Sequence, residues 1–279
     1  MDNNTVVHTL TPLQDKLLSL LKWFDCFCRD NNLRYYAIGG TMLGAMRHQG
    51  FIPWDDDIDL GMPREDYEKL RAFEGIKYDH YIIETYASTA KDYCYPASKV
   101  FDTNTTLVEH KRYNVSRGVF LDIFPIDGIG EDLEQAKRNY KKIGNLYRYY
   151  LTTIAAVRKG RGFKKNLAVV LSHCVPSFLQ NQRNLRITLN KYCTEFNNDN
   201  NKFGGNLIGA YFEREIVPLE LFGNPTEYDF EDFKILGPEK GDEYLTHIYK
   251  DWRILPPKEK QVTHHDFLKI DLNKSYLSD

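Results

Sequence analysis

Apolar residues return every three or four positions after Thr11 and Pro12, which is typical of a helix with one buried face. These apolar positions are Leu13, Leu17, Leu20, Leu21, Phe24 and Phe27. Short runs that suit β-strands follow, and they alternate with segments of helical composition. Strands are predicted at residues 34–38, 55–60, 81–86, 96–101, 105–109 and 119–124, and helices at 42–48 and 63–73.

A different pattern begins at residue 131. Residues 131–158 form a long charged stretch with apolar residues on one side, and residues 185–196 repeat that helical spacing before a polar turn at 197–201. We therefore predict an α/β (α+β) fold. A mixed β-sheet core flanked by helices is expected in residues 1–130, and a mainly helical part in residues 131–279.

The stretch at residues 35–59 joins several of these elements around a glycine turn. An apolar strand leads into Gly39, Gly40 and Thr41, and a short helix follows. Two glycines let a backbone come close to a bulky anion, and the start of the next helix points free N–H groups and a positive dipole end at it. The turn therefore predicts a phosphate cradle, although a glycine pair alone also marks ordinary turns.

An acidic run follows the short helix. Side chains alternate along a strand, so Asp57 and Asp59 are expected to face one way and Asp56 the other. Two strand rises separate the Cα atoms of the first pair by about 6–7 Å, which lets two carboxylates share one or two hard cations. The run therefore predicts a metal site beside the phosphate cradle.

Two other interpretations of the acidic run fit less well. Most acidic runs are solvated loops, but here Trp54, Ile58 and Leu60 interleave with the acids, which suits the edge of a core. An EF-hand loop that starts at Asp55 needs Gly in place of Leu60 and a bidentate Glu in place of Asp66, so that match fails.

A lone acid stands inside the apolar β run at residues 119–124. An unpaired buried carboxylate is costly, and a metal partner would relieve that cost. We therefore predict Asp122 as a third metal ligand. Asp127 follows Pro125 in an Ile-Asp-Gly sequence and is predicted to be a turn residue instead.

These motifs resemble one known family. The run GGTMLGAMRHQGFIPWDDDIDLGMPREDY is similar to the signature of LicD-type phosphotransferases, which include fukutin and its relatives. They belong to the nucleotidyltransferase-fold superfamily, whose pattern is a glycine pair with Ser or Thr, Asp-x-Asp, and a third acid on a later strand, here Asp122. The likeness covers the first half of the chain well and the C-terminal third more loosely. It implies a nucleotidyltransferase-like catalytic core in residues 1–130, with residues 131–279 packed on it and completing the acceptor site.

The resemblance also implies an activity. It implies transfer of a phospho-alcohol, such as phosphocholine, from a CDP-activated donor such as CDP-choline, with release of CMP. The acceptor would be a hydroxyl of a cell-surface glycan or its lipid-linked precursor, as in the modification of lipopolysaccharide, capsule or teichoic acid. The expected cofactor is Mg²⁺, as one or two ions, with Mn²⁺ as a substitute.

The same resemblance assigns roles to individual residues. The expected catalytic and metal-binding residues are Asp57, Asp59 and Asp122. The expected donor-binding residues are Gly39, Gly40, Thr41, Arg47 and Lys99. For Lys99, an exposed surface lysine is an equally good interpretation of the sequence.

Two rival functions use the same sequence features. A nucleotidyltransferase would attack the α-phosphorus of a triphosphate and release pyrophosphate, and it needs the same metals and cradle. The second rival is an inert protein that binds a glycan or a membrane surface. Such a protein would not need three acids that converge on one site.

Composition adds limits on location and partners. The chain has 279 residues and a net charge of −2, which gives no argument for nucleic-acid binding. Its five cysteines are an odd number without zinc-site spacing, so reduced thiols are expected. The N-terminus lacks the basic start and apolar core of a signal peptide. We therefore predict a cytoplasmic protein with no nucleic-acid partner.

A basic cluster at residues 158–165 precedes an apolar stretch at residues 167–179. The stretch is too short and too interrupted to span a bilayer. A buried helix is the preferred interpretation, and peripheral contact with the inner face of an anionic membrane is the alternative.

The C-terminal run YLTHIYKDWRILPPKEKQVTHHD again resembles the family, which often has Gly-Asp, an aromatic residue, Pro-Pro and a His there. Lys250 stands where Gly is usual, which leaves the role of Asp251 open. His264 and His265 are predicted to be surface residues, with an approach to the site as the alternative.

Overall fold

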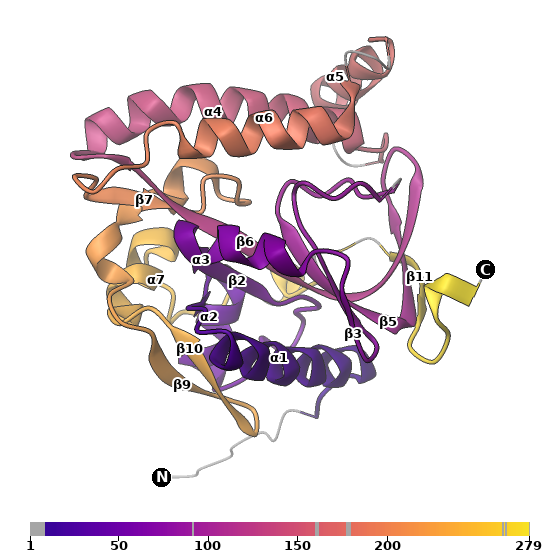
Figure 1. Ribbon diagram of the computed structural model, residues 1–279, viewed down its shortest axis with the longest axis horizontal. Helices are drawn as coiled ribbons and strands as arrows, with labels where there is room; N and C mark the ends of the chain where they lie inside the picture. Colours follow the sequence, from indigo (N-terminus) through magenta and orange to yellow (C-terminus); the bar gives the residue numbers. More distant parts are fainter. Residues whose placement is uncertain are drawn as a thin grey trace.

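A computed structural model describes residues 9–90, 92–159, 162–176, 180–263, 265 and 267–278. A nine-stranded mixed sheet crosses the molecule, with α4 and α6 on one side and α1 on the other (Figure 1). The predicted α/β class with a central mixed sheet is confirmed.

Seven α-helices occur in the described residues. They are α1 (Pro12–Asp30), α2 (Gly39–His48), α3 (Arg64–Lys69), α4 (Leu133–Ile154), α5 (Phe163–His173), α6 (Gln182–Thr194) and α7 (Gly241–Tyr249). Short 3₁₀ helices lie at Leu70–Phe73, Phe212–Glu215, Leu219–Leu221, Lys258–Lys260 and Tyr276–Ser278.

The main path of the sheet has the order β1-β2-β6-β5-β4-β3. Its strands are β1 (Tyr36–Ala37), β2 (Asp59–Pro63), β3 (Lys77–Tyr78), β4 (Tyr81–Glu84), β5 (Ser98–His110) and β6 (Asn114–Gly130). Only β2 and β6 run parallel along this path; its other pairs are antiparallel. The site described below lies where the parallel pair meets β5.

Later segments return to the same sheet. β7 (Phe203–Gly205) pairs with β6, β8 (Val217–Pro218) pairs with β7, and β11 (Phe267–Asp271) pairs with β5. β9 (Thr226–Phe230) and β10 (Phe233–Gly237) form a separate hairpin. The boundary at residue 130 between a core and a second part stays a prediction.

Helix α1 forms as its sequence predicts. Thr11 and Gln14 make a reciprocal capping box at its start, which satisfies two orphan backbone N–H groups. Its apolar stripe is buried against the sheet, with Leu20, Leu21 and Phe24 fully covered. Burying a side chain of this size contributes about 1.5–3 kcal/mol, so the stripe fixes α1 on that face.

Some predicted elements differ from the structure. Residues 96–101 and 105–109 belong to one long strand, β5, and the predicted strand at 55–60 begins only at Asp59. The chain turns before that point, where the Asp55 N–H donates to the Ile52 carbonyl at 2.8 Å. The expectation that Asp57 and Asp59 share one face of a strand is therefore wrong, because Asp57 lies in the loop before β2.

The predicted buried helix in the apolar stretch at residues 167–179 is also wrong in part. α5 hides Val169 and Ser172, whereas Val170 is 46% exposed and Leu171 59% exposed. Residues 177–179 of this stretch lie outside the described part of the chain.

Candidate active site

Polar residues face one another across the three central strands. Asp59 on β2 lies opposite Asp122 on β6, and Asp122 lies opposite Lys99 on β5. Residues directly opposite on neighbouring strands project from the same face of a sheet. The predicted Asp59 and Asp122 are therefore neighbours, although more than sixty residues of chain separate them.

Lys99 and Asp122 form a largely buried ion pair. Lys99 Nζ lies 2.6 Å from Asp122 Oδ1, and the two side chains are 4% and 14% exposed. The ammonium also lies 3.4 Å from the centroid of the Phe120 ring, a cation–π contact. Asp122 thus has a charged partner within the protein, so its burial does not by itself require a metal, and its role as a metal ligand stays a prediction. The exposed-lysine interpretation of Lys99 is wrong as well.

Helix α2 begins at the glycine pair. Gly39 has φ +54°, a left-handed conformation that costs another residue about 1–2 kcal/mol. Its N–H donates to the hydroxyl of Tyr244 at 3.2 Å. A Cβ at Gly40 would lie 3.0 Å from Asp55 Oδ2, and one at Gly39 would lie 3.5 Å from Asp59 Oδ2. The glycines therefore let two carboxylates lie directly against the start of α2.

Thr41 connects this helix to β2. Its hydroxyl oxygen accepts the Asp59 N–H at 2.8 Å, and its side chain is buried. This bond fixes the start of β2, and with it the Asp59 carboxylate, beside the first turn of α2.

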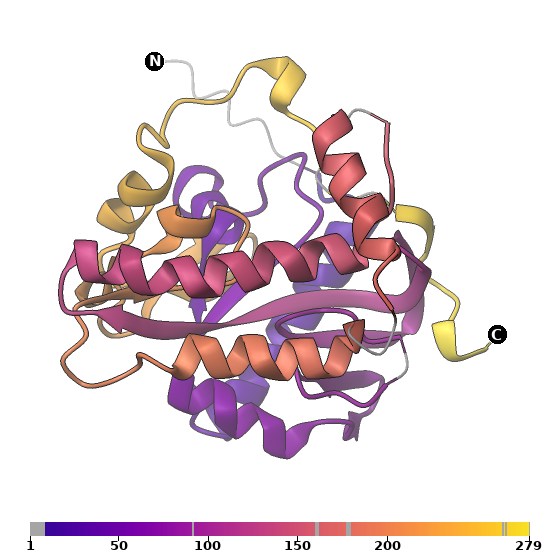
Figure 2. The same ribbon diagram turned by 90° about the horizontal axis from the view of Figure 1, so that it is seen from above.

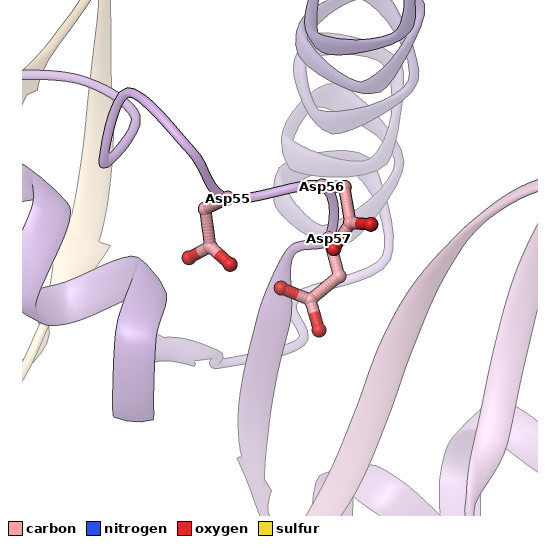
Figure 3. Close-up of side chains that lie close together, drawn as sticks. All are labelled: Asp55, Asp56 and Asp57. Atoms are coloured by element: carbon pink, nitrogen blue, oxygen red, sulfur yellow. The ribbon is translucent and has the colours of Figure 1, made fainter. Parts of the chain in front are cut away.

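Three consecutive acids gather in the loop before β2. Ligand oxygens of Asp55, Asp56 and Asp57 all lie within 4.8 Å of one another, and Figure 3 shows their carboxylates on this loop. Burial, followed by the charge of Asp57, raises the pKa of Asp55 to about 8. Burial and then Asp57 likewise raise the pKa of Asp59 well above its ordinary value. Such a group of carboxylates favours a bound cation, because a cation offsets both the burial and the mutual repulsion.

His265 lies against the same acids. Its Nδ1 is 3.0 Å from Asp56 Oδ1 and 3.8 Å from Asp57 Oδ2, and its ring stacks on Phe267. Burial lowers the pKa of His265, but the hydrogen bond to Asp56 and the charge of Asp57 outweigh it and raise the pKa. The surface interpretation of His265 is wrong, whereas His264 lies outside the described residues.

Asp127 has a structural role. It lies in β6, is fully buried, and accepts hydrogen bonds from Arg64 Nε at 2.7 Å and Nη2 at 2.5 Å. The predicted turn at Asp127 is therefore wrong. A two-point Arg–carboxylate pair of this kind fixes the two side chains in one geometry.

A cavity of about 840 Å³ opens beside the acids. Its lining includes four predicted site residues, namely Gly40, Arg47, Asp57 and Asp59, and also Asp55. Arg47 is held in place because its Nη1 donates to the Trp252 carbonyl at 2.9 Å.

The far wall of this cavity comes from the C-terminal part. It carries the aromatic residues Tyr211, Tyr249 and Trp252, and also Asp251. Sequence reasoning assigned no site role to the aromatic residues. The C-terminal run that resembles the family contains Tyr249 and Trp252 and could have pointed to them, whereas nothing in that run points to Tyr211.

Comparison with known proteins shows which family this chain matches. Residues 32–147 match the family described as LicD/FKTN/FKRP, nucleotidyltransferase domain. The chain carries a LicD-family domain. The matched region contains every site residue predicted from the sequence, and the resemblance is confirmed.

One relative extends the comparison over most of the chain, and two others match short segments of it. The chain is 29% identical over 269 residues to the lipopolysaccharide cholinephosphotransferase LicD of Haemophilus influenzae, which covers 92% of this chain and 96% of that protein. It is 51% identical over 45 residues to the ribitol 5-phosphate transferase FKRP of Homo sapiens, covering 15% of this chain and 9% of that protein. An uncharacterized protein of Rickettsia prowazekii is 58% identical over 36 residues, which are 13% of this chain and 14% of that protein.

Proposed function

We propose that this chain is a metal-dependent phosphotransferase. It moves a phospho-alcohol, such as phosphocholine, from a CDP-activated donor to a hydroxyl of a glycan or its lipid-linked precursor. The bond between the transferred phosphorus and CMP breaks, a new bond to the acceptor oxygen forms, and CMP leaves. The observation that carries the proposal is the gathering of Asp55, Asp57 and Asp59 at the start of α2, inside one cavity.

The acids fit a hard divalent cation such as Mg²⁺, or Mn²⁺ in its place. Both take oxygen ligands, and the loop before β2 offers carboxylates within 4.8 Å of one another. Asp57 and Asp59 would hold the cation, with Asp122 as the third predicted ligand and Asp55 and Asp56 as further carboxylates that the geometry adds. When bound, such an ion neutralises charge on the phosphoryl group and makes the acceptor hydroxyl more acidic.

The donor fits the other side of the cavity. The N–H groups of α2 that follow Gly39, whose own N–H donates to Tyr244, and the Arg47 guanidinium supply positive charge for the donor's phosphates. Tyr211, Tyr249 and Trp252 supply aromatic faces, which suit a cytosine ring or a quaternary ammonium group. Lys99 is predicted to bind the donor as well, and its ion pair with Asp122 supports an indirect contact through that carboxylate. A carboxylate of the acidic cluster accepts the proton that the acceptor hydroxyl loses.

The leaving group separates this proposal from its rivals. The purified protein should release CMP from at least one of CDP-choline, CDP-ribitol and CDP-glycerol in the presence of Mg²⁺ and a glycan acceptor. Release of pyrophosphate from CTP instead would establish a nucleotidyltransferase. Failure of both reactions, together with no calorimetric signal for Mg²⁺ binding, would favour an inert binding protein.

Single substitutions test the metal site itself. Asp57→Asn and Asp59→Asn should each lower turnover roughly a hundredfold or more. Residues that only hydrogen-bond to a metal ligand typically cost about 10–100-fold when replaced, and a ligand itself should cost more. Removing one like charge from the cluster should leave the melting temperature unchanged or higher without metal. Asp199→Asn, in an exposed loop, is the matched control and should keep full activity. Full activity of both site variants would refute the metal assignment.

A further inference from the structure

Helix α5 presents an apolar face that the rest of the described chain does not cover. Phe163 and Leu171 are 81% and 59% exposed, and Leu167 and Val170 are also exposed. The buried residues of α5 are Val169 and Ser172, and the Ser172 hydroxyl donates to the Thr152 carbonyl of α4 at 2.9 Å. Exposed apolar side chains grouped on one element indicate a surface that meets a partner.

The charges on this helix oppose its own stability. Lys164 and Lys165 occupy its first turn, which contains no acidic residue. Cations at a helix N-terminus meet the positive end of the dipole, where acids would be favourable. Lys159, just before the helix, is exposed as well. These three lysines lie close to Phe163 in sequence and do not stabilise the helix. An external anion that they bind explains their presence better.

A second segment, residues 254–262, also exposes apolar side chains, and its charged residues Lys258, Glu259 and Lys260 carry a net charge of +1. Ile254, Leu255 and Val262 are 66%, 52% and 54% exposed, and Lys258 and Lys260 are exposed beside them. The segment is also the rim of the candidate active site, because Ile254, Leu255 and Lys260 line its cavity. Figure 2 shows α5 and this rim reaching toward the same side of the molecule.

We propose that α5 and residues 254–262 together dock onto an anionic lipid bilayer. Apolar side chains bordered by lysines match the boundary between acyl chains and anionic headgroups, where an amphipathic helix lies in the plane of the surface. No helix in the described part of the chain is long and apolar enough to cross a bilayer. Docking by these two elements turns the mouth of the cavity toward the lipid. That orientation suits an acceptor carried on a lipid, a consequence that rests on the proposed function, whereas the docking itself does not.

The test is partitioning of the full chain onto vesicles, without nucleotide or acceptor. The protein should float with vesicles of phosphatidylcholine mixed with phosphatidylglycerol and stay in solution with phosphatidylcholine alone. Salt should release it, because exposed charges are screened beyond a Debye length of about 8–10 Å. Lys164→Gln/Lys165→Gln should weaken partitioning about 25-fold, since each lysine near an anionic surface is worth about fivefold. Phe163→Ser/Leu171→Ser should weaken it about tenfold or more.

Matched controls separate docking from general charge. The control Lys22→Gln/Lys234→Gln removes the partly exposed Lys22 of α1 and the exposed Lys234 of β10. It should leave partitioning within twofold of that of the unchanged protein. Circular dichroism and melting temperature establish that each variant is folded. Equal losses in the α5 and control pairs would overturn the proposal, as would no flotation at low salt. A solution dimer that the Phe163→Ser/Leu171→Ser variant dissociates would assign the face to a second copy instead.

Discussion

The ion pair between Lys99 and Asp122 offers the sharpest test of how the site is built. Replacing Lys99 by Met keeps a long unbranched side chain and removes the charge 2.6 Å from Asp122. Asp122 is then left with only 14% of its side chain exposed and with Asp59 opposite it on the neighbouring strand. Removing one partner of a buried pair typically costs about 3–5 kcal/mol, because the other charge stays buried without compensation.

That cost is large beside a total stability of about 5–15 kcal/mol. Urea unfolding at neutral pH should therefore show a lower midpoint with an unchanged slope, and the melting temperature should fall by roughly 10 °C. The double variant Lys99→Met/Asp122→Asn removes both charges and should recover at least about 2 kcal/mol, a coupling within the range of direct contacts. A cost below about 1 kcal/mol for Lys99→Met, or no recovery in the double variant, would refute the reasoning.

The stability of these two variants with and without Mg²⁺ distinguishes two roles for Asp122. If Asp122 is also a metal ligand, as its sequence predicts, saturating Mg²⁺ should stabilise Lys99→Met more than the double variant, in which only the other carboxylates remain to hold the ion. If its partner is Lys99 alone, Mg²⁺ should stabilise both variants equally.

Three further outcomes are expected. Gly40→Val should weaken donor binding in a calorimetric titration, because even a Cβ there would lie 3.0 Å from Asp55 Oδ2. Unchanged donor affinity in a folded variant would show that Gly40 serves only to form the turn. Asp127→Asn should cost about 1–3 kcal/mol, because Arg64 loses its two-point partner and keeps only Glu68 and Asn190, while turnover per folded molecule is retained. A turnover loss as large as that of the site variants would contradict this. In the absence of metal, the raised pKa of Asp55 favours its protonated form in the folded state, so stability should fall as pH rises from about 4 through about 8. Melting curves should show this decline, and Mg²⁺ should reverse it at about pH 8; a metal-free melting temperature that rises over this window would contradict the sign.

Local patterns predicted the parts of the fold that depend on local chemistry. The stripe from Leu17 to Phe27 predicts α1 because helical spacing and burial coincide there. The glycine pair predicts a close backbone approach, and Gly39 adopts the left-handed conformation that such an approach uses. Asp122 stands out in its strand for a sound reason, since a carboxylate in that position needs a partner.

The identity of that partner could not be read from the sequence. Lys99 reaches Asp122 only through the register of β5 against β6, which long-range packing sets. His265 meets Asp56 for the same kind of reason, across 209 positions of chain. The strand predicted at 55–60 starts late because a turn forms before Asp59, and the acids then gather on a loop rather than alternate on a strand.

The contact between Gly39 and Tyr244 has a consequence for how the protein is made. Its two residues are 205 positions apart, and a ribosome adds about 5–20 residues per second, so the Gly39 amide waits roughly 10–40 s for its partner. During that interval the emerging polypeptide already holds the acids, while α7 and the far wall of the cavity do not yet exist. Newly synthesised chains should therefore acquire donor affinity late, in one step, when α7 docks. A chain interrupted before α7 would contain the whole LicD-family match at residues 32–147, but it would lack the part of the cavity wall that Tyr249 and Trp252 form.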